Sequence, residues 1–177
     1  MGNEGTAKTA RTESFVVPTG TFHDLFAGPG GIRVWIDWEE LFRLSIPVRV
    51  TFASSIDDLE GGYLPWYLAP EGREVDFDDD ARPVALAEFP DAESSLGKER
   101  REKIAALRAA LASSESVHLL VPAYDLGGGR KLILDGCHRL AALTALPVRL
   151  KAVVFTLEGP LEPTVLPDLS RWRDGSG

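Results

Sequence analysis

Hydrophobic and polar positions repeat most regularly in the second half of the chain. Residues 98–112 carry Ile104, Leu107 and Leu111 at helical spacing, and charged residues fill the opposite face. This pattern predicts an amphipathic helix packed on a core. Four short apolar runs in the same half predict strands, at residues 83–87, 117–121, 131–134 and 148–157.

A glycine-rich segment, residues 125–130, separates two of these strands and predicts a hairpin loop. A second helix is expected from Cys137 to Leu146, because Pro147 disfavours helical backbone in the residue before it. The order strand, helix, strand, hairpin, strand, helix, strand predicts an α/β (α+β) core over residues 82–160, with a small mixed sheet and packed helices.

The first half is patterned less clearly and predicts a β-rich extension over residues 15–81. Near-alternation predicts a strand at 32–38, and a second strand at 45–52 would carry Pro47 at its start or at a sheet edge. The segment 61–70 is expected to be an aromatic loop. Four aromatic residues of this half either belong to the core or line a substrate pocket: Trp35, Trp38, Trp66 and Tyr67.

The remaining segments predict no regular structure. Residues 1–14 are expected to form a disordered tail, and residues 161–177 a C-terminal tail. The acidic run from Asp76 to Asp80 does not have the spacing of a calcium loop, so we expect a solvated linker before the core.

Charge and cysteine content narrow the classes of function. The 177 residues have a formal net charge of −8, which argues against DNA as a partner because binding to nucleic-acid phosphates needs clustered Lys and Arg. Cys137 is the only cysteine, so an intramolecular disulfide and a multi-cysteine zinc site are excluded. No apolar run approaches the ~20 residues that span a bilayer. We expect a cytoplasmic, bacterial protein without a membrane partner.

Chemistry-bearing residues gather in the segment Asp135-Gly136-Cys137-His138-Arg139, where an apolar strand turns into a helix. The first N–H groups of a helix have no intrahelical partner and favour an anion. Gly136 lets the backbone approach a ligand, while His138 and Arg139 add side-chain donors. A thiol at a helix start has a lowered pKa in general. The segment predicts either a phosphate-binding turn with Cys137 as a candidate nucleophile, or only a capped helix with a buried cysteine.

Residues 135–142 resemble the Asp-Gly-x-His-Arg-x-x-Ala signature of the ParB/sulfiredoxin superfamily. Within them, residues 136–139 are similar to the Gly-Cys-His-Arg active site of sulfiredoxins, and residues 135–139 to the Asp-Gly-His-His-Arg of free serine kinases. Residues 83–93 resemble the family's opening strand and acidic element, in which Glu93 stands where the serine kinases have their catalytic base.

The resemblance implies a ParB/sulfiredoxin-like fold and, following the serine kinases, phosphoryl transfer from ATP or ADP to the hydroxyl of a small metabolite. The phosphates would bind the backbone N–H groups of Gly136 to Arg139, and the side chains of His138 and Arg139 would stabilise developing charge. Asp135 would hold Mg²⁺. Glu93 would take the proton of the acceptor hydroxyl.

Departures from the family leave two other functions open. Sulfiredoxins usually have Gly where this chain has Asp135, and the serine kinases have His where it has Cys137. One alternative is a sulfiredoxin-like thiol reductase in which Cys137 attacks a phosphorylated sulfinate. The other is a nucleotide-sensing or protein-binding module that retains the turn without the chemistry.

Overall fold

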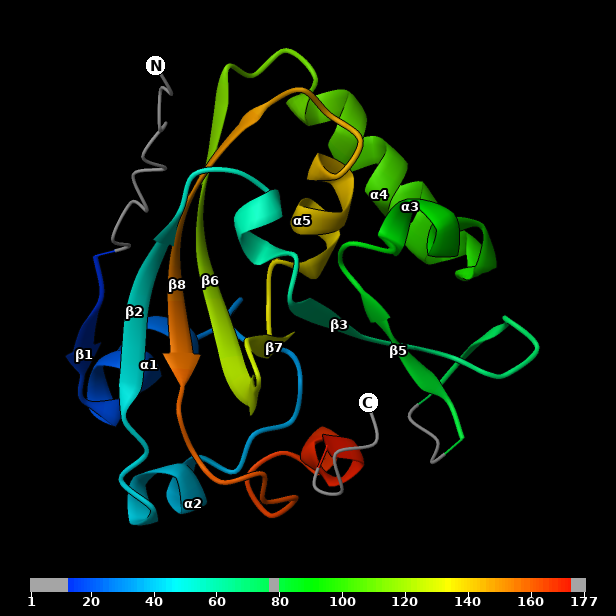
Figure 1. Ribbon diagram of the computed structural model, residues 1–177. Helices are drawn as coiled ribbons and strands as arrows, with labels where there is room; N and C mark the ends of the chain where they lie inside the picture. The colour runs from blue at the N-terminus through cyan, green and yellow to red at the C-terminus, as the bar shows by residue number, and fades with distance from the viewer. Residues whose placement is uncertain (1–12, 77–79, 173–177) are drawn as a thin grey trace, which may run out of the picture.

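The computed structural model describes residues 13–76 and 80–172, which form a mixed sheet surrounded by helices (Figure 1). The strands are β1 (Phe15–Val17), β2 (Val48–Ala53), β3 (Gly62–Leu68), β4 (Glu74–Val75), β5 (Arg82–Ala85), β6 (Ser116–Gly127), β7 (Arg130–Ile133) and β8 (Arg149–Leu157). The helices are α1 (Thr19–Phe26), α2 (Trp38–Arg43), α3 (Phe89–Ala92), α4 (Lys98–Leu111) and α5 (Cys137–Leu143), with 3-10 turns η1 (Asp57–Leu59), η2 (Glu93–Ser95) and η3 (Pro167–Trp172). None of the helices in these two ranges is both long and apolar enough to cross a bilayer.

The sheet joins both halves of the chain. In the described residues, eight strands form one sheet in the order β1-β2-β8-β6-β7-β3-β4, and β5 pairs with β3. The long strand β6 pairs in parallel with β8 and antiparallel with β7, and β7 pairs in parallel with β3. Strands β2 and β3 therefore flank the β8-β6-β7 centre on its two sides. The boundary expected between residues 81 and 82 does not divide the sheet.

Two hydrophobic clusters cover the two faces of the sheet. The first joins α3, α4 and α5 to the sheet and contains the fully buried Ile104. The second joins α1, α2 and η3 to the sheet and contains Phe22 and Trp172. Neighbouring residues of β8 alternate between the two clusters, as Val154 and Phe155 do, because successive strand side chains point to opposite faces. Figure 1 shows α3, α4 and α5 gathered on one side of the molecule, away from α1 and α2.

The elements predicted for the second half are confirmed. The amphipathic helix is α4, and the four predicted strands correspond to β5, β6, β7 and β8. The glycine-rich hairpin joins β6 to β7, where Gly127, Gly128 and Gly129 all have positive φ angles. The helix expected from Cys137 to Leu146 is α5, which ends earlier, at Leu143. A mixed sheet with packed helices is therefore the architecture of the chain.

Two element predictions for the first half are wrong, whereas the strand after Pro47 is confirmed as β2. Residues 32–38 form no strand. Their last residues turn into α2, where the Asp37 carboxylate accepts a hydrogen bond from the Glu40 N–H at 2.9 Å and caps the helix. Residues 61–70 contain β3 in place of a loop. A shift in register between Leu64 and Tyr67 accommodates Pro65 within the strand.

The C-terminal tail predicted from residue 161 needs correction for residues 161–172. Leu169 is fully buried and Trp172 is 2% exposed, so η3 forms part of the second cluster. The Trp172 ring also packs against the Tyr63 ring, with centroids 4.8 Å apart. Burial of such large apolar side chains is the main force that holds the segment on the sheet. The rest of that tail, residues 173–177, lies outside the described residues.

Two other predictions fall wholly or partly outside the described residues. They are the disordered tail, of which residues 1–12 lie outside, and the acidic linker, of which residues 77–79 lie outside.

Candidate functional site

The turn between β7 and α5 carries the motif that the sequence analysis singled out. The Leu134 N–H donates to the Pro122 carbonyl oxygen at 2.9 Å, which keeps the chain on the sheet up to the turn. Gly136 then has a φ of +80°, a conformation that side-chain-bearing residues rarely adopt. Its carbonyl oxygen accepts the Leu140 N–H at 2.9 Å, and α5 begins. The backbone therefore requires glycine at this position whether or not a ligand binds.

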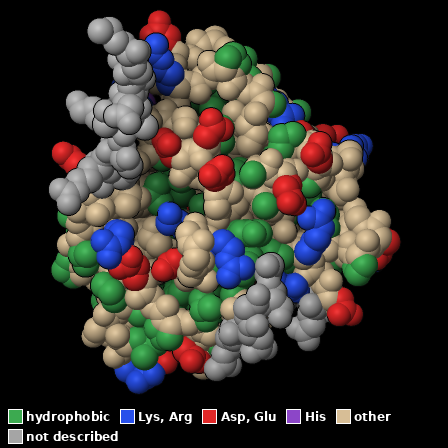
Figure 2. Space-filling model, viewed as in Figure 1, with side chains coloured by type: hydrophobic (Ala, Val, Ile, Leu, Met, Phe, Trp, Pro, Cys, Tyr) green, Lys and Arg blue, Asp and Glu red, His purple; other side chains and the backbone are tan. Residues whose placement is uncertain are grey.

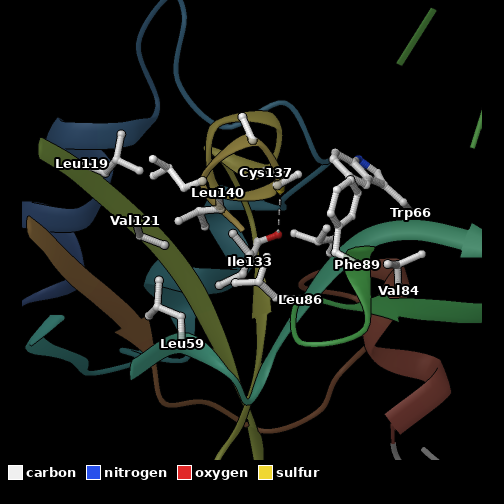
Figure 3. Packing of buried hydrophobic residues seen from close by; sticks show 14 of the residues in the cluster. Leu59, Trp66, Val84, Leu86, Phe89, Leu119, Val121, Ile133, Cys137 and Leu140 are labelled. Atoms are coloured by element: carbon white, nitrogen blue, oxygen red, sulfur yellow. Dashed lines mark hydrogen bonds between the residues drawn. The ribbon is translucent and has the colours of Figure 1, made fainter. Parts of the chain in front are cut away.

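Cys137 faces the core. Its side chain is 7% exposed and belongs to the first hydrophobic cluster, as Figure 3 shows. The thiol contacts the carbonyl oxygen of Ile133 (Sγ···O 3.7 Å). Burial, followed by the charge of Asp135, raises the pKa of Cys137 to about 12. The lowered pKa expected at the helix start is therefore wrong, because loss of hydration outweighs the field of a seven-residue helix.

His138 packs against the ring of Trp66, with the two ring centroids 5.0 Å apart. Its pKa falls from the ordinary value of 6.5 to about 4, mainly because of burial and then because of the positive charges of Lys103, Arg100 and Arg33. The imidazole is therefore neutral at pH 7. It offers one N–H donor and one acceptor nitrogen.

Cationic side chains from separate segments lie around His138. Arg33 belongs to the loop before α2, Arg100 and Lys103 belong to α4, and Arg139 is the next residue of α5. Among the described residues, Arg100 alone of these four has an ion-pair partner, and the other three are exposed. Positive charge thus accumulates locally on a chain whose net charge is −8. Such a cluster favours a polyanion.

Asp135 is half-buried in the turn, and its charge acts on both Cys137 and His138. Within residues 13–76 and 80–172, no group of three or more His, Cys, Asp or Glu side chains could hold a metal ion. Asp135 therefore offers a single carboxylate. This suits Mg²⁺ when phosphate oxygens and water supply the other ligands, because Mg²⁺ binds with one or two carboxylates plus substrate phosphates.

Glu93, the predicted base, is engaged in an ion pair. Its two carboxylate oxygens accept hydrogen bonds from the two Nη groups of Arg108 at 2.8 and 2.7 Å. The side chains of Arg108 and Glu93 are 24% and 23% exposed, so solvent screens the pair only in part. Glu93 can accept a proton only after it leaves Arg108.

A cleft of about 580 Å³ opens beside Trp66, between the loop before α2, strands β3 and β4, and the start of α4. Three aromatic residues line it: Trp35, Trp66 and Tyr67. Trp66 and Tyr67 are each 4% exposed, whereas Trp35 is 59% exposed. Trp66 and Tyr67 are therefore both core residues and part of a pocket wall, so the two alternatives for these aromatics hold together. Trp38, the fourth of the set, is half-buried against the second cluster and does not line this cleft.

Two carboxylates of the cleft, of Glu74 and Asp168, were not predicted from the sequence. Glu74 accepts hydrogen bonds from the Gly97 N–H and from Arg100 Nε, the latter at 2.7 Å. Asp168 accepts one from the Tyr67 hydroxyl and so ties η3 to β3. No local pattern marks either residue, because Arg100 lies 26 residues from Glu74 and Tyr67 lies 101 residues from Asp168.

The chain matches no protein-family model, no curated protein and no solved structure. The assignment of function therefore depends on the geometry of this site and on the motif in residues 135–142.

In the native protein, Cys137 should resist alkylation by iodoacetamide near neutral pH, because its thiol is buried and protonated. Labelling followed by mass spectrometry should proceed no faster than the protein opens, and should become complete in denaturant. Fast stoichiometric labelling of the folded protein would contradict the inward orientation of the thiol.

His138 should make the fold sensitive to acid. Its pKa is about 4 in the folded protein against an ordinary value of 6.5, so the unfolded chain takes up the proton first. The contribution of neutral His138 to stability is therefore complete above pH 6.5 and is lost as the pH falls toward 4. Urea denaturation of His138→Gln should show a smaller loss across this window, while His118→Gln, on the exposed side of β6, should behave like the wild type. A native NMR titration of His138 with its midpoint near 6.5 would refute this prediction.

Proposed function

We propose that the protein is a nucleotide-dependent phosphotransferase that transfers a phosphoryl group from ATP or ADP to the hydroxyl of a small metabolite. The observation that carries the proposal is the gathering of Arg33, Arg100 and Lys103 near His138, in the turn where the Asp-Gly-x-His-Arg motif adds Arg139 as the next residue. The resemblance of that motif to free serine kinases supports the same function. It also supports a fold of the ParB/sulfiredoxin type.

A phosphate chain suits this cluster better than a single carboxylate does. Three exposed cations that have no ion pair in the described residues, Arg33, Lys103 and Arg139, could each contact a different phosphoryl oxygen. Their segments are fixed by packing, so the positive charge is already in position when the nucleotide arrives. This kind of preorganisation is the main protein contribution to phosphoryl transfer.

The residues around the turn then take distinct roles. Arg139, Lys103 and Arg33 hold phosphoryl oxygens, and neutral His138 adds one N–H donor. Asp135 would bind the Mg²⁺ that accompanies the nucleotide and neutralises part of its charge. In the transfer itself, the acceptor oxygen bonds to the terminal phosphorus while the bridging P–O bond breaks and the shorter nucleotide leaves. The hydroxyl proton passes to Glu93 once that carboxylate is free of Arg108.

The ion pair between Glu93 and Arg108 also favours a second candidate, a nucleotide-binding module without turnover. A carboxylate held by both guanidinium Nη groups is a poor proton acceptor. The kinase proposal therefore requires Glu93 to leave Arg108 before it accepts the proton of the acceptor hydroxyl. Measuring turnover separately from binding distinguishes the two.

The sulfiredoxin-like alternative finds less support in the geometry. That chemistry needs a thiolate that water and substrate can reach. Cys137 is instead 7% exposed, and burial raises the pKa of its thiol.

Arg139→Ala should weaken ATP or ADP binding by about 1.5–3 kcal/mol, or tenfold and more, as expected for loss of a charge-assisted hydrogen bond. The fold should persist, because the Arg139 side chain is exposed. Arg43→Ala removes an exposed arginine from α2 and serves as the matched control. Isothermal titration calorimetry measures both affinities. Equal affinities for the wild type and Arg139→Ala would mean that this turn does not bind phosphate.

A ³¹P NMR time course with ATP or ADP, Mg²⁺ and a panel of hydroxyl-bearing amino acids should reveal a new phosphate ester. Glu93→Gln should bind nucleotide normally and lower turnover by about 10²–10⁴-fold, the usual contribution of a general base. Nucleotide binding with no new ester for any acceptor would support the module without turnover instead.

A further inference from the structure

We infer that the aromatic cleft beside the cation cluster receives the nucleobase of the nucleotide, with Trp35 as the ring on which the base stacks. This inference rests on the proposed function, because it assigns the other end of a ligand whose phosphates lie near His138. The cleft volume of about 580 Å³ is typical of sites for small organic ligands.

Trp35 is the aromatic residue of the cleft with an open ring. It is 59% exposed, which is unusual for so large an apolar side chain. The ring of Trp66 is already covered by the Arg100 guanidinium, 4.5 Å from its centroid, and the ring of Tyr67 by that of Arg171, at 5.3 Å. Within residues 13–76 and 80–172, Trp35 packs against no other ring. It therefore offers a stacking surface to an incoming planar group.

The cleft and the cation cluster are neighbours that share Arg100. Trp35 is two residues from Arg33 in the loop before α2, so the same loop contributes a ring to the cleft and a cation near His138. Arg100 lines the cleft, and its charge also reaches His138. Trp66 lines the cleft as well and packs against His138. The two regions therefore lie close enough for the inference that one nucleotide occupies both.

The signs of the charges determine which end of the nucleotide fits where. The lining of the cleft includes three carboxylates, of Glu74, Asp76 and Asp168, against two guanidinium groups, of Arg73 and Arg100, so its charge is less favourable to a phosphate chain than the cluster around His138. Carboxylates accept hydrogen bonds, and every nucleobase presents N–H donors at its edge. An uncharged aromatic ring with such donors suits the cleft, whereas the polyanion suits the cations around His138.

The test compares ATP with inorganic tripolyphosphate, which carries the same phosphate chain but no base. Calorimetry on the full chain should give tighter binding for ATP than for tripolyphosphate. Trp35→Ala should weaken ATP binding by about 5- to 100-fold, the usual range for loss of base–aromatic stacking, and should leave tripolyphosphate binding unchanged. Trp35→Phe should retain most of the ATP affinity, since it keeps a ring. Phe52→Ala removes another exposed aromatic, on β2, and should bind both ligands as the wild type does.

The outcomes separate the two proposals. Binding of both ligands with equal affinity, or an ATP affinity unchanged in Trp35→Ala, would overturn the nucleobase site and leave the phosphate site standing. Equal weakening of both ligands by Trp35→Ala would also overturn it, because Trp35 would then act only by positioning Arg33. Failure of both ligands to bind the wild-type protein would refute the proposed function, and the nucleobase site with it.

Discussion

The parallel pairing of β3 with β7 determines how the site is assembled. The strands approach closely because Gly61 has no side chain: a Cβ there would lie 2.5 Å from the carbonyl oxygen of Gly129. Because no side chain is in the way, the Gly61 carbonyl oxygen accepts a hydrogen bond from the Lys131 N–H at 2.9 Å. Parallel strands need a long connection, and this one contains β4, β5, α3, α4 and β6. The pairing therefore brings Trp66, on β3, beside His138, which follows β7.

Ion pairs and hydrogen bonds of the acidic residues explain how a chain with a net charge of −8 carries a cationic site. Glu74 is held by Arg100, Glu93 by Arg108, and Asp168 by the Tyr67 hydroxyl. Each contact joins segments that are distant in sequence, so these carboxylates stabilise the tertiary structure. In the described residues they leave Arg33, Lys103 and Arg139 without an ion pair, and neutral His138 cannot lower the positive charge by losing a proton.

The sequence predicted most of what depends on local periodicity and little of what depends on distant contacts. Helix α4 and strands β5 to β8 followed from spacing alone. The alternating segment 32–38 gave a wrong strand prediction. Asp37 instead caps a helix at the end of this segment, and alternation does not reveal a cap. The burial of Cys137 was in fact encoded: Leu140 and Ala141, one helical turn later, are apolar, and Arg139 lies about 200° around the helix from Cys137. The contact between Tyr67 and Asp168 spans 101 residues and had no such signal.

Helix α4 carries side chains of both proposed roles, phosphate binding and proton transfer. It carries Arg100 and Lys103 toward His138, and two turns later it carries Arg108, which holds Glu93. A polyanion on the first pair of cations adds negative charge beside the same helix, and its attraction acts on a rigid element that also fixes the Arg108–Glu93 contact. In the proposed function, helix α4 would therefore link the place of the base, Glu93, to the phosphate site. Both Nη groups of Arg108 hold the Glu93 carboxylate at a fixed place beside this helix, so the proposed transfer requires the loaded site to loosen that pair before Glu93 can accept a proton.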